Sequence, residues 1–313
     1  MNRVLVTGGA GFIGHHVLER LSLLNCPVTV IDNLSNRNKN YSFSDTNISF
    51  YKEDIRNKDN ISDIFKQERI DTCIHLAANI SIYDSVLNPY DTLDTNVKGT
   101  LNVLEACSNN QVKNFVFASS GAVYGEPKKF PISEDHPLDP LSPYGLSKVI
   151  GETLVSTYRK LKKLHHAISL RFFNVYGEGQ TVEYAGVITK FAERLSKGLP
   201  PIIYGDGYQT RDFVSVNDVT NAILLAAESH NNISQDVFNV ATGKSIDINN
   251  LAQIMIRISG FDFEPIYKEE REGDIKYADV DVTNSKNILG FIASEKLEVA
   301  LNQMIKHVLC KSV

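Results

Sequence analysis

Short runs of apolar residues alternate with longer amphipathic stretches through the first half of the chain. The apolar runs predict six strands, at residues 3–7, 28–32, 48–54, 71–77, 114–119 and 167–173. Most of the stretches between them repeat their apolar positions with helical spacing, which predicts helices at residues 13–24, 61–67, 94–108 and 144–164. Because this alternation is typical of βαβ units, we expect an α/β fold with a doubly wound parallel sheet covered by helices.

The second half of the chain has a looser rhythm. It predicts loops at residues 176–186 and 204–211, helices at 187–197 and 217–228, and an acid-rich segment at 268–281. No internal repeat or flexible linker separates the halves, so we expect two parts packed over a shared cleft. Residues 1–175 are expected to form the sheet domain and 176–313 a smaller, loop-rich domain, with the chain returning to the sheet near 210–245.

Composition narrows the classes of protein to consider. The 313 residues are 42% hydrophobic, which is enough for a full core, and the net charge of -5 disfavours nucleic acid as a partner. The N-terminus lacks the apolar stretch of a signal peptide, and no run approaches the roughly 20 apolar residues of a membrane helix. We therefore expect a soluble, cytoplasmic protein with no membrane partner.

The four cysteines, at positions 26, 73, 107 and 310, are scattered along the sequence. They form no close pairs, and no histidines cluster with them at metal-ligand spacing. We therefore expect buried thiols, with neither a disulfide framework nor a metal site.

A glycine-rich turn follows the first predicted strand, with Gly8, Gly11 and Gly14 in the segment that includes Phe12 and Ile13. Glycine at these points permits a tight turn, lets the backbone approach a pyrophosphate and lets the following helix pack on the sheet.

An acidic residue, Asp32, ends the second predicted strand roughly 20 residues beyond the glycine turn. An acid there accepts hydrogen bonds from the adenine ribose and repels a 2′-phosphate, which favours NAD over NADP. A turn-forming role for Asp32 before Asn33 is compatible with this one. The first domain is thus expected to be a Rossmann-type NAD-binding domain.

Two further strand ends carry weaker signals. Asp54 and Ile55 end the third predicted strand and can reach an adenine edge, while Ala77 and Ala78 end the fourth and leave room for a cofactor. Turn chemistry and strand–helix packing explain these residues equally well.

Tyr144 and Lys148 lie one turn apart in a predicted helix that begins after Ser142, a favourable N-cap. A phenol is a poor base at neutral pH unless positive charge stabilises its phenolate, and Lys148 can supply that charge. Ser120, at the carboxyl end of the fifth predicted strand, can bind a hydroxyl that is being oxidised, or can simply start the turn at Gly121.

Several segments together resemble the extended short-chain dehydrogenases/reductases, and within them the NAD-dependent sugar epimerase/dehydratase family, most of all the UDP-glucose 4-epimerases. The segments are TGGAGFIG at 7–14, DNLS at 32–35, HLAA at 75–78, NVKGT at 96–100, the serines at 119–120, the Tyr144/Lys148 pair, RFFNVYG at 171–177, QTRDF at 209–213 and REGD at 271–274.

The resemblance implies a redox epimerisation of a UDP-sugar on a recycled NAD. Tyr144, helped by Ser120, takes the proton of the sugar 4-hydroxyl while hydride leaves C4, and Lys148 holds the nicotinamide ribose. The transient 4-keto sugar turns and takes the hydride back on its other face. Homologues dimerise through two long helices per subunit, here 94–108 and 144–164, so a homodimer is expected.

The same resemblance implies the binding residues. Those expected at the cofactor are Gly8, Gly11, Phe12, Ile13, Gly14, Asp32, Asn33, Ser35, Asp54, Ile55, Leu76, Ala77, Ala78, Asn96, Ser119, Tyr144, Lys148 and Phe172. Those expected at the substrate are Ser81, Ser120, Tyr144, Asn174, Val187, Tyr204, Arg211, Arg271, Asp274 and Ala278. Tyr204 is expected to stack on uracil. The structural alternatives are surface ion pairs for Arg211 and Arg271 and a core position for Tyr204.

Two positions bear on which reaction is performed. Dehydratases of the family carry an acid two residues after the catalytic serine, where this chain has Ala122, so simple epimerisation is favoured. Ala278 matches a position beside the sugar C2 substituent and leaves room for an acetamido group, although a one-residue shift would place Tyr277 there. The alternative interpretations are a UDP-glucuronate 4-epimerase, another NAD-dependent enzyme that modifies nucleotide sugars, and a non-catalytic NAD-binding regulator.

Overall fold

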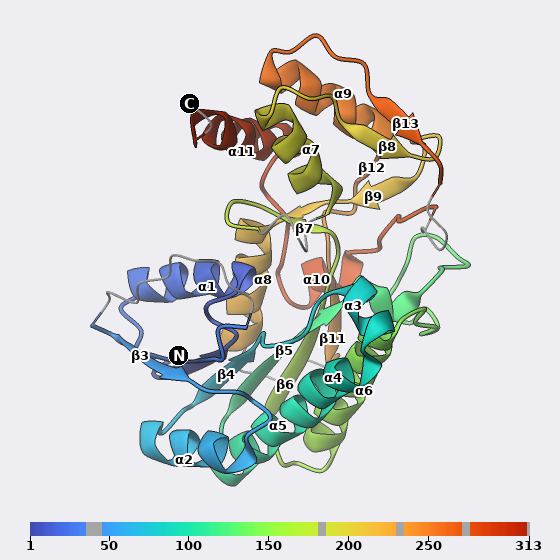
Figure 1. Cartoon of the computed structure of the whole chain (residues 1–313). Helices are drawn as coiled ribbons and strands as arrows, with labels where there is room; N and C mark the ends of the chain where they lie inside the picture. Colours follow the sequence, from blue (N-terminus) through green and yellow to red (C-terminus); the bar gives the residue numbers. More distant parts are fainter. Residues whose placement is uncertain (36–45, 181–185, 230–234, 271–275, 312–313) are drawn as a thin grey trace.

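The computed structural model describes residues 1–35, 46–180, 186–229, 235–270 and 276–311. A seven-stranded sheet lies at its centre, with strand order β11-β6-β5-β4-β1-β2-β3 and every neighbouring pair parallel (Figure 1). The strands are β1 (Val4–Thr7), β2 (Val28–Asp32), β3 (Ile48–Lys52), β4 (Thr72–His75), β5 (Asn114–Ser120), β6 (His166–Phe172) and β11 (Val237–Val240). The predicted doubly wound parallel sheet is confirmed.

Helices cover both faces of this sheet. They are α1 (Phe12–Leu23), α2 (Lys58–Glu68), α5 (Thr100–Asn109), α6 (Pro143–Lys160) and α8 (Val216–Glu228). Successive strand residues face opposite sides, so Val4 and Val6 pack with α1 and α8 in one core, while Leu5 packs with α2, α5 and α6 in another. Because both faces are buried, each strand is a nearly continuous apolar run, which is the pattern that the sequence displays.

A smaller part of the molecule lies above the sheet in Figure 1 and is built on short two-stranded sheets, β10-β7, β12-β9 and β13-β8. Its elements are β7 (Val175–Tyr176), α7 (Val187–Ser196), β8 (Ile202–Tyr204), β9 (Thr210–Asp212), β10 (Val214–Ser215), β12 (Ser245–Asp247), α9 (Ile248–Ser259), β13 (Ile266–Lys268) and α11 (Leu297–Lys311). The short helix α10 (Thr283–Asn287) packs instead on β11 of the large sheet. Leu195, Leu251 and Leu301 form the smaller part's own apolar core between α7, α9 and α11. The loop predicted over 204–211 was wrong at both ends, where β8 and β9 lie.

The chain passes back to the large sheet after β10. Helix α8 packs on α1, and β11 pairs with β6 at the edge of the sheet. Residues beyond 176 therefore complete the sheet and its first core, and the boundary at 175/176 stays a prediction.

Four short elements at the carboxyl side of the sheet were not predicted in the form observed. They are α3 (Ile82–Leu87), α4 (Pro89–Leu93), a π-helical segment η1 (Asp94–Gly99) that precedes α5, and a 3₁₀ turn η2 (Gly121–Tyr124). The single helix predicted over 94–108 thus begins as η1 and continues as α5.

The cysteines behave as expected where they are described, since Cys26, Cys73 and Cys107 are buried and carry free thiols. The side chain of the fourth cysteine, at position 310, lies outside the described residues. None of the helices described is long and apolar enough to cross a bilayer.

Candidate active site

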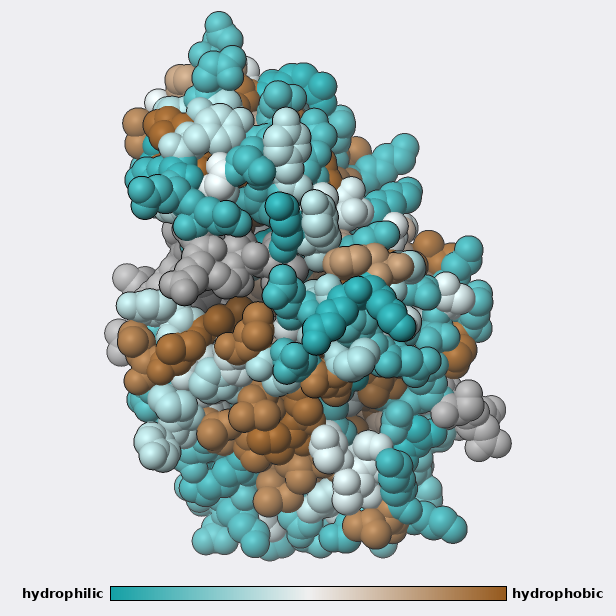
Figure 2. Space-filling model, turned by 90° about the vertical axis from the view of Figure 1, so that its right-hand side faces the viewer, coloured by the Kyte–Doolittle hydropathy of each residue, from teal (hydrophilic) through white to brown (hydrophobic). Residues whose placement is uncertain are grey.

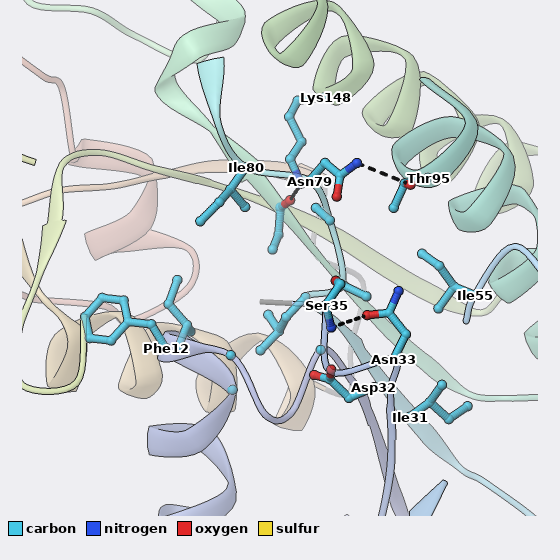
Figure 3. Close-up of a pocket in the computed structure, with 18 of the residues that line it drawn as sticks. Phe12, Ile31, Asp32, Asn33, Ser35, Ile55, Asn79, Ile80, Thr95 and Lys148 are labelled. Carbon is cyan, nitrogen blue, oxygen red and sulfur yellow. Dashed lines mark hydrogen bonds between the residues drawn. The ribbon is translucent and has the colours of Figure 1, made fainter. Parts of the chain in front are cut away.

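A pocket runs along the carboxyl ends of the central strands, where an open α/β sheet places its ligands (Figure 3). Asp32, Asn33 and Ser35 lie together at one end of it, and Lys148 and Asn79 lie toward the other. The predicted cofactor residues that line this pocket are Gly8, Gly11, Phe12, Ile13, Gly14, Asp32, Asn33, Ser35, Ile55, Leu76, Ala77, Ala78, Ser119, Tyr144, Lys148 and Phe172.

The glycine turn is fitted to its surroundings at each of its three predicted positions. Gly8 has φ 71°, and a Cβ there would lie 2.7 Å from the backbone nitrogen of Ala77. A Cβ on Gly14 would collide with the carbonyl oxygen of Gly8. Gly11 is the N-cap of α1 and offers no side chain, so the first N–H groups of the helix lack a side-chain cap and are available to an anion. The turn therefore fits a pyrophosphate.

Asp32, at the end of β2, holds the backbone of this glycine turn by hydrogen bonding. Its Oδ2 accepts a hydrogen bond from the Ala10 backbone N–H at 2.9 Å, and its Oδ1 accepts one from Leu34 N–H at 2.8 Å. Burial raises the pKa of Asp32 above its ordinary value, and these two hydrogen bonds oppose that effect. Asp32 thus forms the expected turn and also lines the pocket.

Two predicted cofactor residues do not line the pocket. The carboxylate of Asp54 accepts hydrogen bonds from Arg56 (2.9 and 2.8 Å) and from Asn33 Nδ2 (2.9 Å). The hydrogen bonds from Arg56 lower the pKa of Asp54 to about 2. Asn96 is buried and its side chain bonds to Asn79 instead. Both residues hold neighbours that do line the pocket.

The catalytic candidates meet at the N-terminus of α6. Ser142 is the N-cap, as predicted, and accepts a hydrogen bond from Gly145 N–H at 3.1 Å. Ser120, at the end of β5, is close enough to Tyr144 to affect its pKa. The Lys148 ammonium donates to the carbonyl oxygen of Ala118 at 2.8 Å and lies 5.8 Å from the centre of the Tyr144 ring.

At the Tyr144 end of the pocket, burial has the largest effect on the pKa values of the ionisable side chains. Burial raises the pKa of Tyr144, and the Ser120 hydroxyl opposes the rise. Burial lowers the pKa of Lys148 to about 8, and the charge of Glu152 opposes that fall. The protein side chains alone therefore do not make Tyr144 a phenolate at neutral pH, so further positive charge beside it would be needed.

Strand β9 gathers three of the predicted substrate residues. It contains Arg211, its Asp212 carbonyl accepts a 2.9 Å hydrogen bond from Asn174, and the hydroxyl of Thr210 accepts one of 3.2 Å from the Ala278 N–H. Ala278 is buried.

The remaining substrate candidates are spread over several elements. Tyr204 ends β8, Ser81 is the N-cap of α3, and Val187 begins α7. Arg271 and Asp274 lie outside the described residues.

Sequence reasoning missed several residues that line the pocket. Asn79 and Ile80 directly follow Ala78, so their position after a strand end was a usable signal. Thr95 of η1 and Gln180 of the smaller part also line it, and no local pattern marks them.

The glycine turn and Asp32 at one end of the pocket, with Tyr144 and Lys148 at the other, define a Rossmann-type site suited to a dinucleotide beside acid–base groups. The model of the NAD dependent epimerase/dehydratase family matches residues 4–241. The chain therefore belongs to this family, and NAD is its cofactor.

Individual homologues agree with that assignment. The putative UDP-glucose 4-epimerase of Methanocaldococcus jannaschii is 43% identical over 307 residues, which cover 97% of this chain and 96% of that protein. The solved UDP-glucose 4-epimerase of Thermotoga maritima with UDP-glucose has a TM-score of 0.92 and 37% identity, and 99% of each chain is covered. The UDP-N-acetylglucosamine 4-epimerase of Methanobrevibacter ruminantium, solved with UDP-N-acetylmuramic acid, has a TM-score of 0.92 and 36% identity, also over 99% of each chain.

Proposed function

We propose that this protein interconverts the C4 epimers of UDP-hexoses, UDP-glucose with UDP-galactose and also UDP-N-acetylglucosamine with UDP-N-acetylgalactosamine. The observation that carries the proposal is that Tyr144 and Lys148 line the same pocket as the glycine turn, with the Ser120 hydroxyl acting on Tyr144. The similar chains named as UDP-glucose and UDP-N-acetylglucosamine 4-epimerases support the substrate class.

Each catalytic side chain has a defined task in this reaction. Ser120 donates to the sugar 4-oxygen and orients it, while Tyr144 Oη takes the 4-hydroxyl proton and later returns it. Lys148 holds positive charge beside Tyr144 and favours its deprotonated form. Bound NAD supplies the acceptor, and later the donor, of the C4 hydride. The 4-keto sugar turns between the two hydride transfers, which inverts C4.

Epimerisation is favoured over dehydration because of the two residues after Ser120. These residues, Gly121 and Ala122, begin the turn η2, and Ala122 N–H donates to Ser120 Oγ at 3.2 Å. Neither carries a carboxyl group that can protonate a leaving hydroxyl, whereas the epimerase mechanism requires none there.

The binding residues predicted from sequence are assigned to two ligands. The residues of the glycine turn and Asp32 are assigned to NAD, and Asn174, Arg211 and Ala278 to the nucleotide sugar. The shared hydrogen bonds of β9 support the second group.

We further propose that the protein is a homodimer. Helices α3, α4 and α6 lie on the right of Figure 1, the side that Figure 2 turns to the viewer, where apolar side chains gather. The large apolar side chains exposed on these helices are Ile82, Tyr83, Val86, Leu87, Tyr90 and Leu146. A contiguous apolar surface of this kind on a protein of this class favours burial against a second copy.

Product identification tests the proposed function. The purified protein is incubated separately with UDP-glucose, UDP-N-acetylglucosamine and UDP-glucuronate, and the sugars are separated and identified by NMR. We expect 4-epimers from the first two substrates. A 4-epimer from UDP-glucuronate alone, or a 4-keto-6-deoxy product, contradicts the proposal.

A further inference from the structure

Helix α6 carries a third polar side chain in line with the two catalytic candidates. Tyr144, Lys148 and Glu152 are spaced one turn apart on one face of the helix. Glu152 is only 6% exposed. The proposed mechanism employs the first two residues and gives no role to this buried carboxylate.

The hydrogen bonds of the Glu152 carboxylate are directed toward the catalytic strands. Oε1 accepts hydrogen bonds from the Ser119 hydroxyl and, at 2.9 Å, from Arg171 Nε, while Oε2 accepts one from Arg171 Nη2 at 2.7 Å. This bidentate pairing fixes the plane of the carboxylate. Ser119 lines the pocket and precedes Ser120, so Glu152 holds the end of β5 from behind.

Arg171 is itself fixed from the opposite side. Its Nη1 donates to Tyr124 Oη at 2.7 Å and to the carbonyl oxygen of Glu134 at 3.0 Å. Tyr124 Oη donates in turn to Asn239 Oδ1 at 2.6 Å. The position of Glu152 is therefore imposed by β6, η2 and β11, in addition to its own helix.

The ionisable groups that act on Lys148 come from two elements. Tyr144 and Glu152 stand on its own helix and His75 on β4. Burial lowers the pKa of His75 to about 3, so this ring is neutral at physiological pH. The negative charge of Glu152 raises the pKa of Lys148 against the effect of burial.

We propose that Glu152 is a positioning residue for the reaction, fixing the Ser119–Ser120 end of β5 by a hydrogen bond and placing its negative charge behind the Lys148 ammonium. Arg171 pairs with this carboxylate in the interior and holds it in place. The expected change in kcat rests on the proposed function, whereas the expected change in the titration of Lys148 does not.

The variant Glu152→Gln removes the charge and preserves the shape. It leaves Arg171 buried without its ionic partner, so Glu152→Gln/Arg171→Met provides a companion with neither charge. Glu105→Gln is the matched control, because Glu105 accepts a hydrogen bond from Tyr158 on the same helix α6 and lies outside the pocket.

The direct measurement is the titration of Lys148 by NMR in protein labelled with ¹³C at lysine Cε. The resonance is assigned by its disappearance in Lys148→Met. We expect a midpoint near 8 in the unmodified protein, a midpoint lower by about half a pH unit or more in both Glu152→Gln proteins, and no change in Glu105→Gln. A midpoint that stays in place in Glu152→Gln, or that the added Arg171→Met change restores, overturns the proposal.

Kinetics provide the second measurement. Glu152→Gln is expected to lower kcat about tenfold above pH 8 while KM for UDP-glucose changes less than about twofold, because the residue lies behind the reacting end of the site. The double variant is expected to regain thermal stability without regaining kcat. Recovery of kcat together with stability would mean that Glu152 is only structural. Absence of turnover in the unmodified protein would count against the proposed function alone, since the NMR titration does not depend on it.

Discussion

Asn96 donates a 2.9 Å hydrogen bond to the hydroxyl of Ser147, which in turn donates to the carbonyl oxygen of Tyr144 at 2.7 Å. The same amide group pairs with the backbone N–H and C=O of Asn79, at 2.7 and 2.9 Å. One buried side chain thus joins the loop that lines the cofactor pocket to the helix turn that carries the catalytic tyrosine. Asn96 lies in the π-helical segment η1, a distortion that is frequent at functional sites.

Asn96→Ala is therefore expected to affect both stability and turnover. It leaves the Asn79 backbone groups and the Ser147 hydroxyl without their partner in a buried region, which costs about 1–3 kcal/mol. Denaturant unfolding measures the first effect, and kcat measures the displacement of Tyr144. Asn110→Ala is the control, because the Asn110 side chain bonds locally to Ala106 at the far end of α5. Equal effects of the two substitutions on kcat would exclude the positioning role of Asn96.

Tyr144→Phe is expected to abolish turnover while binding of NAD and of the UDP-sugar survives. The substitution removes only the hydroxyl that carries the proton, and a loss of about a hundredfold or more in kcat is expected. Calorimetry measures binding and product analysis measures turnover. Tyr158→Phe removes a hydroxyl from the same helix, where it bonds to Glu105, and is expected to leave kcat unchanged. A nearly full rate in Tyr144→Phe would mean that another group is the base.

Asp32→Asn is expected to weaken NAD binding and to reduce the discrimination against NADP. The change removes the charge that accepts hydrogen bonds from the ribose and repels a 2′-phosphate, so NAD affinity is expected to fall about 10- to 100-fold. Titration of both cofactors into both proteins gives the ratio of dissociation constants. Asp63→Asn is the control, because Asp63 is an exposed residue of α2. Equal binding of NAD and NADP by the unmodified protein would contradict the role of Asp32.

The strands and both ends of the pocket were predictable because they depend on local signals. Val4 to Thr7 form an apolar run ended by glycines, and Tyr144 and Lys148 stand one turn apart after a serine N-cap. Such patterns arise from burial on two sheet faces and from helix geometry, which the sequence encodes residue by residue.

Some of the missed elements, such as α3 and β9, depend on contacts between distant segments. Helix α3 shows no buried stripe, because Ile82 and Val86 are 54% and 60% exposed. Strand β9 has three residues and exists through its pairing with β12. The Glu152–Arg171 pair joins α6 to β6, and neither residue has a local motif that predicts it.

The apolar surface of α3 is expected to hold two copies together. Tyr83 and Leu87 are 73% and 66% exposed and lie one turn apart. Charged side chains there oppose burial, so Tyr83→Glu/Leu87→Glu is expected to convert a dimer into a monomer in light scattering. Leu24→Glu, at the end of α1, tests a comparably exposed apolar residue away from this surface. A single-chain mass for the unmodified protein would exclude the dimer.

Ala278 and Tyr277 are neighbours that face different surroundings. Ala278 is 7% exposed and its N–H donates to Thr210, whereas Tyr277 is 50% exposed and its ring meets Phe130 edge-on at 6.3 Å. This arrangement favours Ala278 as the residue beside the sugar, and a methyl group there leaves room for an acetamido substituent.

Ala278→Tyr is therefore expected to suppress the N-acetylated substrates selectively. The phenol would occupy the space of the acetamido group, so the ratio of kcat/KM for UDP-N-acetylglucosamine to that for UDP-glucose is expected to fall about tenfold or more. Tyr277→Ala is the matched comparison and is expected to leave that ratio unchanged, because its ring is directed toward Phe130. If the ratio changes in Tyr277→Ala and stays constant in Ala278→Tyr, Tyr277 is the residue that selects the sugar.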